Sequence, residues 1–159
     1  MANGYPRLEF NMQLAASTTW DLVEGTLLIR KEIDNAGVKL RATSGTSGYQ
    51  NKGAWRIKKR GYIPPSSQII PQRWSVSTQR LWMPNVTGVE GSFYAIAPFE
   101  INLGGLSRGD FGIHFDANVP GSAGCIVIRQ QDHWDLFRNE ISAFRLNGIQ
   151  QVPLFVSYD

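Results

Sequence analysis

Residues 110–128, DFGIHFDANVPGSAGCIVI, are the most informative part of this sequence. Apolar and β-branched residues predict one strand over residues 111–115 and a second over residues 125–128. Between them, a segment rich in asparagine, proline and glycine predicts a loop that turns the chain back. His114 stands at the end of the first strand and Cys125 at the start of the second. This order predicts that the two side chains lie side by side.

Other strands are predicted on either side of this stretch. Residues 8–14, LEFNMQL, alternate apolar and polar side chains, which is typical of a half-buried strand. Residues 44–48, SGTSG, are predicted as a loop from their composition, and residues 61–65, GYIPP, as a turn or extended polyproline segment. Further strands are predicted over residues 26–29, 38–42, 92–96 and 154–157.

One helix is predicted near the C-terminus. Its apolar residues recur at spacings of three, four and three, which places them on one helical face. Asp132 is the predicted N-cap, and Asn147-Gly148 the predicted stop. The predicted fold is mainly β, a sandwich or barrel with this single helix, in one domain over residues 1–159. The apolar residues of the helix are Trp134, Phe137, Ile141 and Phe144.

Composition narrows the class of protein. The chain has 159 residues, of which 42% are apolar, enough for one globular core. Its single cysteine excludes an internal disulfide framework. The first residues lack the basic start and apolar run of a signal peptide, and no stretch approaches the roughly 20 apolar residues of a membrane span. We therefore expect cytoplasmic synthesis, with action at the periplasm or cell wall after release or injection, unless the sequence is a trimmed form of a secreted protein.

Basic residues are concentrated in one segment. Residues 35–89 contain no Asp or Glu, whereas nine of the sixteen Lys and Arg residues fall there. Such a segment attracts anionic partners, such as nucleic acid, acidic lipid or an anionic cell wall, although it can also be a solvated face. Trp55 and Tyr62 lie among these basic residues and can stack on nucleic acid. No nucleic-acid-binding motif accompanies them, so a nucleic-acid partner is not favoured.

Cys125 and His114 together suit thiol catalysis. The thiolate is the nucleophilic form, and an imidazole can accept the proton that a free thiol retains at neutral pH. Gly124 permits close approach of the backbone, and the N–H groups of Ala123, Gly124 and Cys125 can stabilise an oxyanion. By itself, a lone cysteine is more often a small buried core residue. The two histidines and one cysteine are too few for a zinc site, and no cofactor is expected.

The context of these residues resembles a known family. Ile113-His114 followed by Ser122-x-Gly124-Cys125-Ile126 is similar to the signature of the L,D-transpeptidase (YkuD) catalytic domain. The order of three upstream segments also resembles a divergent branch that includes antibacterial effectors acting on peptidoglycan, and the resemblance covers residues 40–128. Those segments are Ala42-Thr43-Ser44-Gly45, Gly61-Tyr62-Ile63-Pro64-Pro65 and Arg108-x-Asp110-Phe111.

The resemblance implies a role for each matching residue. Cys125 corresponds to the nucleophile and His114 to the general base. Gly124 and Cys125 correspond to the oxyanion-hole donors, and Ser122 to the loop position that shapes the hole. Ala123 stands where most members have His, and Val127 where many have Arg. The interval between His114 and Cys125 is also shorter than in typical cross-linking members.

The resemblance implies acyl transfer on peptidoglycan stem peptides through a thioester. Loss of two polar groups near the nucleophile favours hydrolysis, as in a phage lysin or an injected effector. The alternatives are a true transpeptidase that cross-links or exchanges D-amino acids, and a non-catalytic wall-binding or virion structural protein. Arg108, Asp116 and Arg129 are candidate substrate-binding residues, although an exposed turn is the favoured interpretation of Asp116. His133, beside the predicted cap, is interpreted as a structural or surface residue.

Overall fold

The structure is a computed structural model that describes residues 4–16, 20–34, 36–116 and 121–159. In these ranges strands are the predominant regular structure, and the one α-helix, α1 (Gln131–Leu146), lies near the C-terminus, which confirms the predicted fold class. The first strands are β1 (Arg7–Met12), β2 (Gly25–Arg30), β3 (Val38–Thr46), β4 (Ser75–Ser77), β5 (Leu81–Met83) and β6 (Gly91–Ala97). The others are β7 (Glu100–Leu103), β8 (Leu106–Gly109), β9 (Gly112–Phe115), β10 (Gly121–Ile128) and β11 (Gln151–Tyr158).

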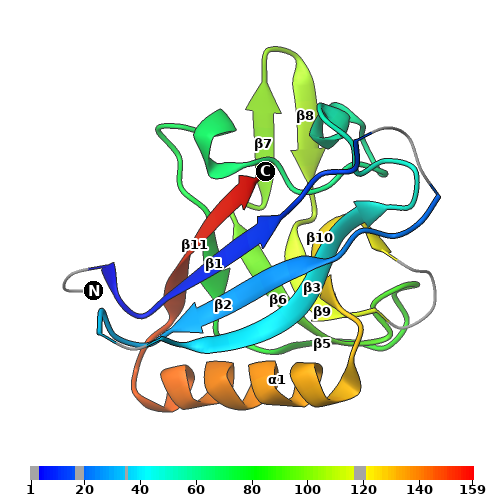
Figure 1. Ribbon diagram of the computed structural model, residues 1–159. Coiled ribbons are helices and arrows are strands. Elements are labelled where there is room, and N and C mark those ends of the chain that lie inside the picture. Colours follow the sequence, from blue (N-terminus) through cyan, green and yellow to red (C-terminus); the bar gives the residue numbers. More distant parts are fainter. Residues whose placement is uncertain (1–3, 17–19, 35, 117–120) are drawn as a thin grey trace.

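The main sheet closes on itself as a barrel. Its strand order is β4-β11-β1-β2-β3-β10-β9-β6-β5, and β4 pairs in addition with β6 through Val76 and Ile96. This last pairing joins the two ends of the order, while β5 extends the edge of β6 (Figure 1). Strands β7 and β8 form a separate hairpin. A closed sheet leaves few unpaired edges, which suits a small domain built of short strands.

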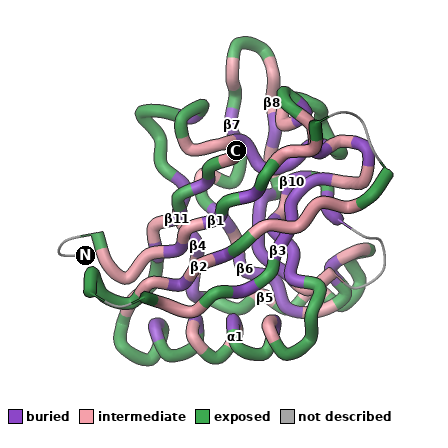
Figure 2. Tube along the Cα trace, viewed as in Figure 1, coloured by how far each residue is buried: buried purple, intermediate pink, exposed green. Residues whose placement is uncertain are grey.

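Alternation along the strands fills the barrel interior. In β1, Leu8, Phe10 and Met12 are fully buried while the residues between them are not, as the period-2 pattern predicts (Figure 2). On α1, Trp134, Phe137, Ile141 and Phe144 are the buried residues, so the helix presents one apolar face to the sheet. No described helix is long and apolar enough to cross a membrane.

Three local predictions are wrong. Residues 44–46 belong to strand β3, not to the predicted loop, because β10 pairs with Ser44 and Thr46. The small side chain of Ser44 is buried, and its hydroxyl oxygen accepts the Ile63 N–H at 2.9 Å. Asp132 does not cap α1, since the N-cap is Gln130. Asp132 lies in the first turn, where its negative charge interacts favourably with the helix dipole. The strand predicted over residues 8–14 ends at Met12.

Candidate active site

Two parallel strands bring the predicted catalytic residues to one place. β9 pairs with β10 in the register Ile113 with Ile126 and His114 with Val127 (Figure 1). His114 and Cys125 line the same cavity, which has a volume of about 440 Å³. The loop predicted between the strands includes residues 117–120, which lie outside the described residues. The two side chains therefore share a cavity, although the strand register pairs His114 with Val127 rather than with Cys125.

The imidazole of His114 is held as a neutral base. Its Nδ1 lies 2.8 Å from the carbonyl oxygen of Phe115, so Nδ1 carries the proton and donates it to that carbonyl. The ring stacks on Phe93 at 5.9 Å between centroids and is only 5% exposed. Burial lowers the pKa of His114 below its usual 6.5. Near neutral pH, Nε2 is therefore unprotonated and able to accept a proton.

The thiol of Cys125 is held in its protonated form. Cys125 is half-buried, and its Sγ donates to the carbonyl oxygen of Asp110 at 3.3 Å. Burial raises the pKa of the thiol to about 12; the Asp110 carboxylate adds to the rise, and contacts with the Gly112 backbone and the Arg108 guanidinium oppose it. The resting pair is therefore a thiol and a neutral imidazole, and attack requires the base to remove the proton as the bond forms.

The backbone around the nucleophile leaves the regular strand ladder. Pairing of β10 with β3 breaks between Gly121 and Ile126, so the residues before Cys125 bulge from the sheet. Within the bulge, the Ser122 hydroxyl donates to the carbonyl of Cys125, and Ala123 is exposed. The predicted oxyanion donors thus belong to a segment that the β3–β10 register does not pair.

Arg108 is buried beneath this bulge. Its guanidinium is 2% exposed and donates to four backbone carbonyls, those of Trp55, Gly61, Tyr62 and Ala123. Burial lowers the pKa of Arg108, but a guanidinium remains charged at neutral pH. Arg108 therefore ties the basic segment to the nucleophile bulge, and its donors are directed to the protein rather than to solvent.

The backbone of Gly124 packs closely against the Arg108 guanidinium. Its φ is +120°, and a Cβ at this position would overlap the Arg108 guanidinium. The close approach expected of this glycine is therefore to Arg108 inside the domain.

We expect Gly124→Ala to lower the free energy of unfolding by about 3 kcal/mol, since overpacking and left-handed strain add together. Gly53→Ala is the matched control, because Gly53 has φ +83° and nothing within 4 Å of an added Cβ. Urea denaturation of both variants measures the difference. Equal losses of unfolding free energy in the two variants would mean that the Arg108 side chain moves aside without an energetic penalty.

Asp116 and Arg129 follow the ends of β9 and β10 and contact each other. The Asp116 carboxylate accepts the Gly121 N–H at 2.9 Å and lies 3.3 Å from Arg129 Nε, and its side chain is only 4% exposed. Interpretation of Asp116 as an exposed turn residue is therefore wrong. Burial raises the pKa of Asp116, although the Gly121 contact and Arg129 oppose this. Arg129 also lies 3.6 Å from Glu24, so both candidate substrate-binding residues have partners within the protein.

A second, smaller cavity adjoins the nucleophile and was not predicted. It has a volume of about 140 Å³ and is lined by Lys58, Lys59, Asp110 and Cys125, among others. Asp110 also lines the larger cavity and has a left-handed φ of +61°, an uncommon conformation for aspartate. Two lysines of the acid-free segment therefore line the same cavity as Cys125. The sequence pattern indicated that this segment is basic, but it did not indicate that the segment lies next to the cavity of Cys125.

Two other sequence residues have structural roles. His133 Nδ1 accepts the Arg41 N–H at 2.9 Å, which ties α1 to β3 and agrees with the structural interpretation of this histidine. Tyr62 is 1% exposed and packs on Tyr158 at 4.4 Å, so its ring is not available to stack on a nucleic-acid base. Among the residues that the structure describes, no three His, Cys, Asp or Glu side chains group as metal ligands.

Comparisons of the chain with family models, with curated proteins and with solved structures found no match.

Proposed function

We propose that this protein is a cysteine-dependent enzyme of L,D-transpeptidase type that acts on peptidoglycan stem peptides and favours hydrolysis. The observation that carries the proposal is that Cys125 and a neutral His114 line one cavity, with Nδ1 of His114 engaged by Phe115. Support for the family comes from the residue context of these two side chains. The proposal fixes a reaction class, acyl transfer, and a nucleophile.

The chemical steps follow from the protonation states. His114 Nε2 accepts the thiol proton as Sγ forms a bond to the substrate carbonyl carbon, giving a tetrahedral oxyanion. The intermediate expels the amine of the leaving residue, which takes the proton from the imidazolium, and a thioester to Cys125 remains. Water then attacks the thioester with His114 again as base, which releases the shortened stem and restores the thiol.

Oxyanion stabilisation is assigned to the bulge. The N–H groups of Ala123, Gly124 and Cys125 belong to the segment between the paired residues Gly121 and Ile126. Backbone donors that are positioned before the reaction stabilise developing charge most effectively. Arg108 holds the carbonyl of Ala123 at 3.1 Å and so limits rotation of the adjoining peptide.

Both cavities include Cys125, and we assign the two parts of the substrate on either side of the scissile bond to different cavities. The larger one, which includes Val89 and Phe93, has room for the acyl portion of a stem. The smaller one presents Lys58 and Lys59 and fits a small residue with a free carboxylate, such as a terminal D-amino acid. This division explains how a terminal residue is placed as the leaving group.

Neutralising these lysines is expected to weaken the binding of substrates that end in a carboxylate. Lys58→Gln/Lys59→Gln should raise KM about three- to tenfold for a tetrapeptide stem with a free terminus, because exposed ion pairs contribute modestly. The same stem with a terminal carboxamide should be unaffected. Lys52→Gln is the control, since Lys52 is an exposed lysine of the same segment outside the cavity. Equal KM changes for both stems would contradict the carboxylate subsite.

The decisive experiment incubates the protein with tetrapeptide muropeptides and identifies the products by mass spectrometry. Water is present at roughly 55 M, and an amine acceptor competes only if a groove gives it a high effective molarity. Ala123 and Val127 supply no polar side chain near the thioester, so we expect release of the terminal D-amino acid and shortened stems. Cross-linked dimers, or exchange of an added D-amino acid, as the main product would replace hydrolysis with transpeptidation. Absence of any product would leave a non-catalytic wall-binding protein.

A further inference from the structure

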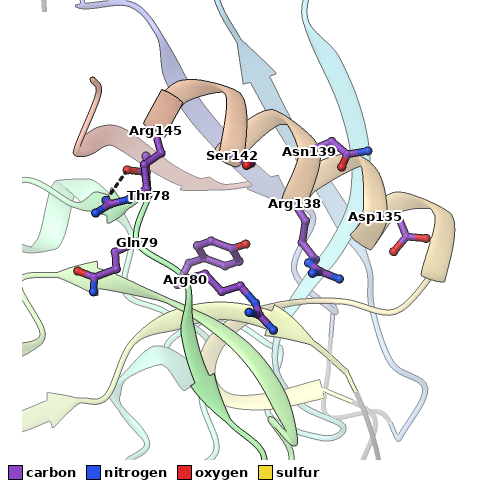
Figure 3. A pocket seen from close by; sticks show the side chains of 9 residues that line it. Thr78, Gln79, Arg80, Asp135, Arg138, Asn139, Ser142 and Arg145 are labelled. Atoms are coloured by element: carbon purple, nitrogen blue, oxygen red, sulfur yellow. Dashed lines mark hydrogen bonds between the residues drawn. The ribbon is translucent and has the colours of Figure 1, made fainter. Parts of the chain in front are cut away.

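A large pocket lies away from Cys125. It has a volume of about 750 Å³ and opens between α1 and the segment around β4, β5 and β6 (Figure 3). It shares no lining residue with either cavity at the thiol. Tyr94 lines it, whereas the preceding residue, Phe93, lines the cavity of His114. Because successive side chains of a strand point to opposite faces, the two sites lie on opposite faces of β6.

Three arginines line this pocket, which we call the arginine pocket. Arg80 comes from the segment before β5, and Arg138 and Arg145 come from α1 (Figure 3). Asp135 is the one acidic residue in the lining, and it accepts a hydrogen bond from Gln131 at 2.9 Å. None of the three arginines makes an ion pair with a carboxylate in the described part of the chain. The pocket therefore has an excess of positive charge.

Neutral partners contact the guanidinium groups of Arg80 and Arg145. Arg80 Nε donates to Ser92 Oγ at 2.5 Å, and its guanidinium lies 4.9 Å from the Trp82 ring centroid. Arg145 Nη1 donates to Thr78 Oγ1 at 3.4 Å (Figure 3).

The Arg138 guanidinium lies near the Tyr94 hydroxyl, where its charge opposes the rise that burial causes in the pKa of Tyr94. These contacts orient the cations without neutralising them, which is the arrangement expected of a preformed anion site.

The spacing of the arginines indicates the size of the ligand. Arg138 and Arg145 are seven residues apart on α1, a rise of about 10 Å along the helix. In Figure 3, Arg145 lies beside Thr78 at one end of the pocket, and Arg138 lies toward the other end. Cations spread along the pocket suit an elongated anion. Planar guanidinium groups bind phosphate oxygens in pairs, which favours phosphate as the anionic group.

We propose that the arginine pocket binds a ligand with two or more phosphate groups, either a free oligophosphate or a phosphodiester chain of a wall polymer. The site needs no catalytic residue, so it can hold the protein to such a polymer while the opposite face of β6 carries out chemistry. Binding of a ligand with several phosphate groups does not depend on the function assigned to Cys125, whereas the role in holding a wall polymer rests on that proposed function.

Titration calorimetry on the full chain tests this proposal. Tripolyphosphate is expected to bind at one site per chain and more tightly than orthophosphate or citrate. Poly(glycerol phosphate) in a second arm separates a polymer ligand from a small one. Arg138→Gln and Arg145→Gln are each expected to weaken binding about tenfold or more, because each removes a charge-assisted bidentate contact. Arg73→Gln, at an exposed arginine outside the pocket, is expected to change affinity less than about twofold.

Other results would overturn the proposal. Absence of saturable tripolyphosphate binding would do so, as would equal loss in Arg73→Gln or equal affinity for citrate. A single-stranded oligonucleotide that binds more tightly than tripolyphosphate and depends on Trp82 would replace it with nucleic-acid binding. Arg138 is partly buried, so the exposed Arg145 variant keeps the test valid if Arg138→Gln alters folding. Arg138→Lys should not restore full affinity, because lysine keeps the charge and loses the planar donor pair.

Discussion

Cys125→Ala is expected to reduce turnover of tetrapeptide muropeptides by a factor on the order of 10⁴ or more, because it removes the atom that becomes acylated. The free energy of unfolding should change by about 1 kcal/mol or less, since Cys125 is only half-buried and its hydrogen bond to Asp110 is a weak thiol contact. Stability and activity should therefore separate in this variant.

Mass spectrometry after acid quenching provides the positive measurement for the same prediction. Wild-type protein should carry the acyl part of the stem as a thioester at Cys125, and Cys125→Ser should accumulate much less adduct. Alkylation by iodoacetamide should be slow near neutral pH and rise steeply in alkaline solution, because the pKa of the thiol is about 12. An unacylated cysteine in a protein that still turns over substrate would sink the assignment of the nucleophile.

His114→Gln is expected to lower kcat by about 10²- to 10⁴-fold, the usual contribution of a positioned base. Gln cannot take the thiol proton, and a thiol of pKa about 12 does not ionise unaided near neutral pH. His133→Gln is the matched control, because the glutamine oxygen can still accept the Arg41 N–H that His133 Nδ1 accepts now. Equal losses in the two variants would show that the wrong histidine was chosen as base.

The pH profile gives an independent measurement of the same base. Burial lowers the pKa of His114 below 6.5, so the neutral form persists into mildly acidic solution. Turnover should therefore fall only below pH 6.5, as the imidazole becomes protonated, and should show no loss from thiol ionisation through mildly alkaline pH. An acidic limb centred above pH 6.5 would contradict a buried neutral base.

Local patterns were sufficient for most of the regular structure. Alternation in residues 8–12 and the three-four-three spacing on α1 depend on neighbours within a few positions, which the sequence contains directly. Strands β4 and β5 have only three residues each, too few for a period to appear. Closure of the barrel by β4 and β6 is a pairing between distant segments, and no local preference encodes it.

Within the candidate site, the sequence by itself determined the chemistry available: one thiol, an imidazole eleven positions before it, and glycines and a serine around the thiol. Residue types and short spacings carry this information because reactivity belongs to the side chain. Context in residues 110–128 also determined which of the two histidines is the candidate base.

Only the tertiary structure decided the environments that tune these groups. Burial sets the protonation of His114 and Cys125, Arg108 braces the bulge through carbonyls from two distant segments, and Lys58 reaches the thiol cavity across the fold. Asp116 is likewise buried by its contacts with Gly121 and Arg129. The physical reason is common to all of them: desolvation and charge proximity depend on distances between atoms, and these are set when strands far apart in sequence pair.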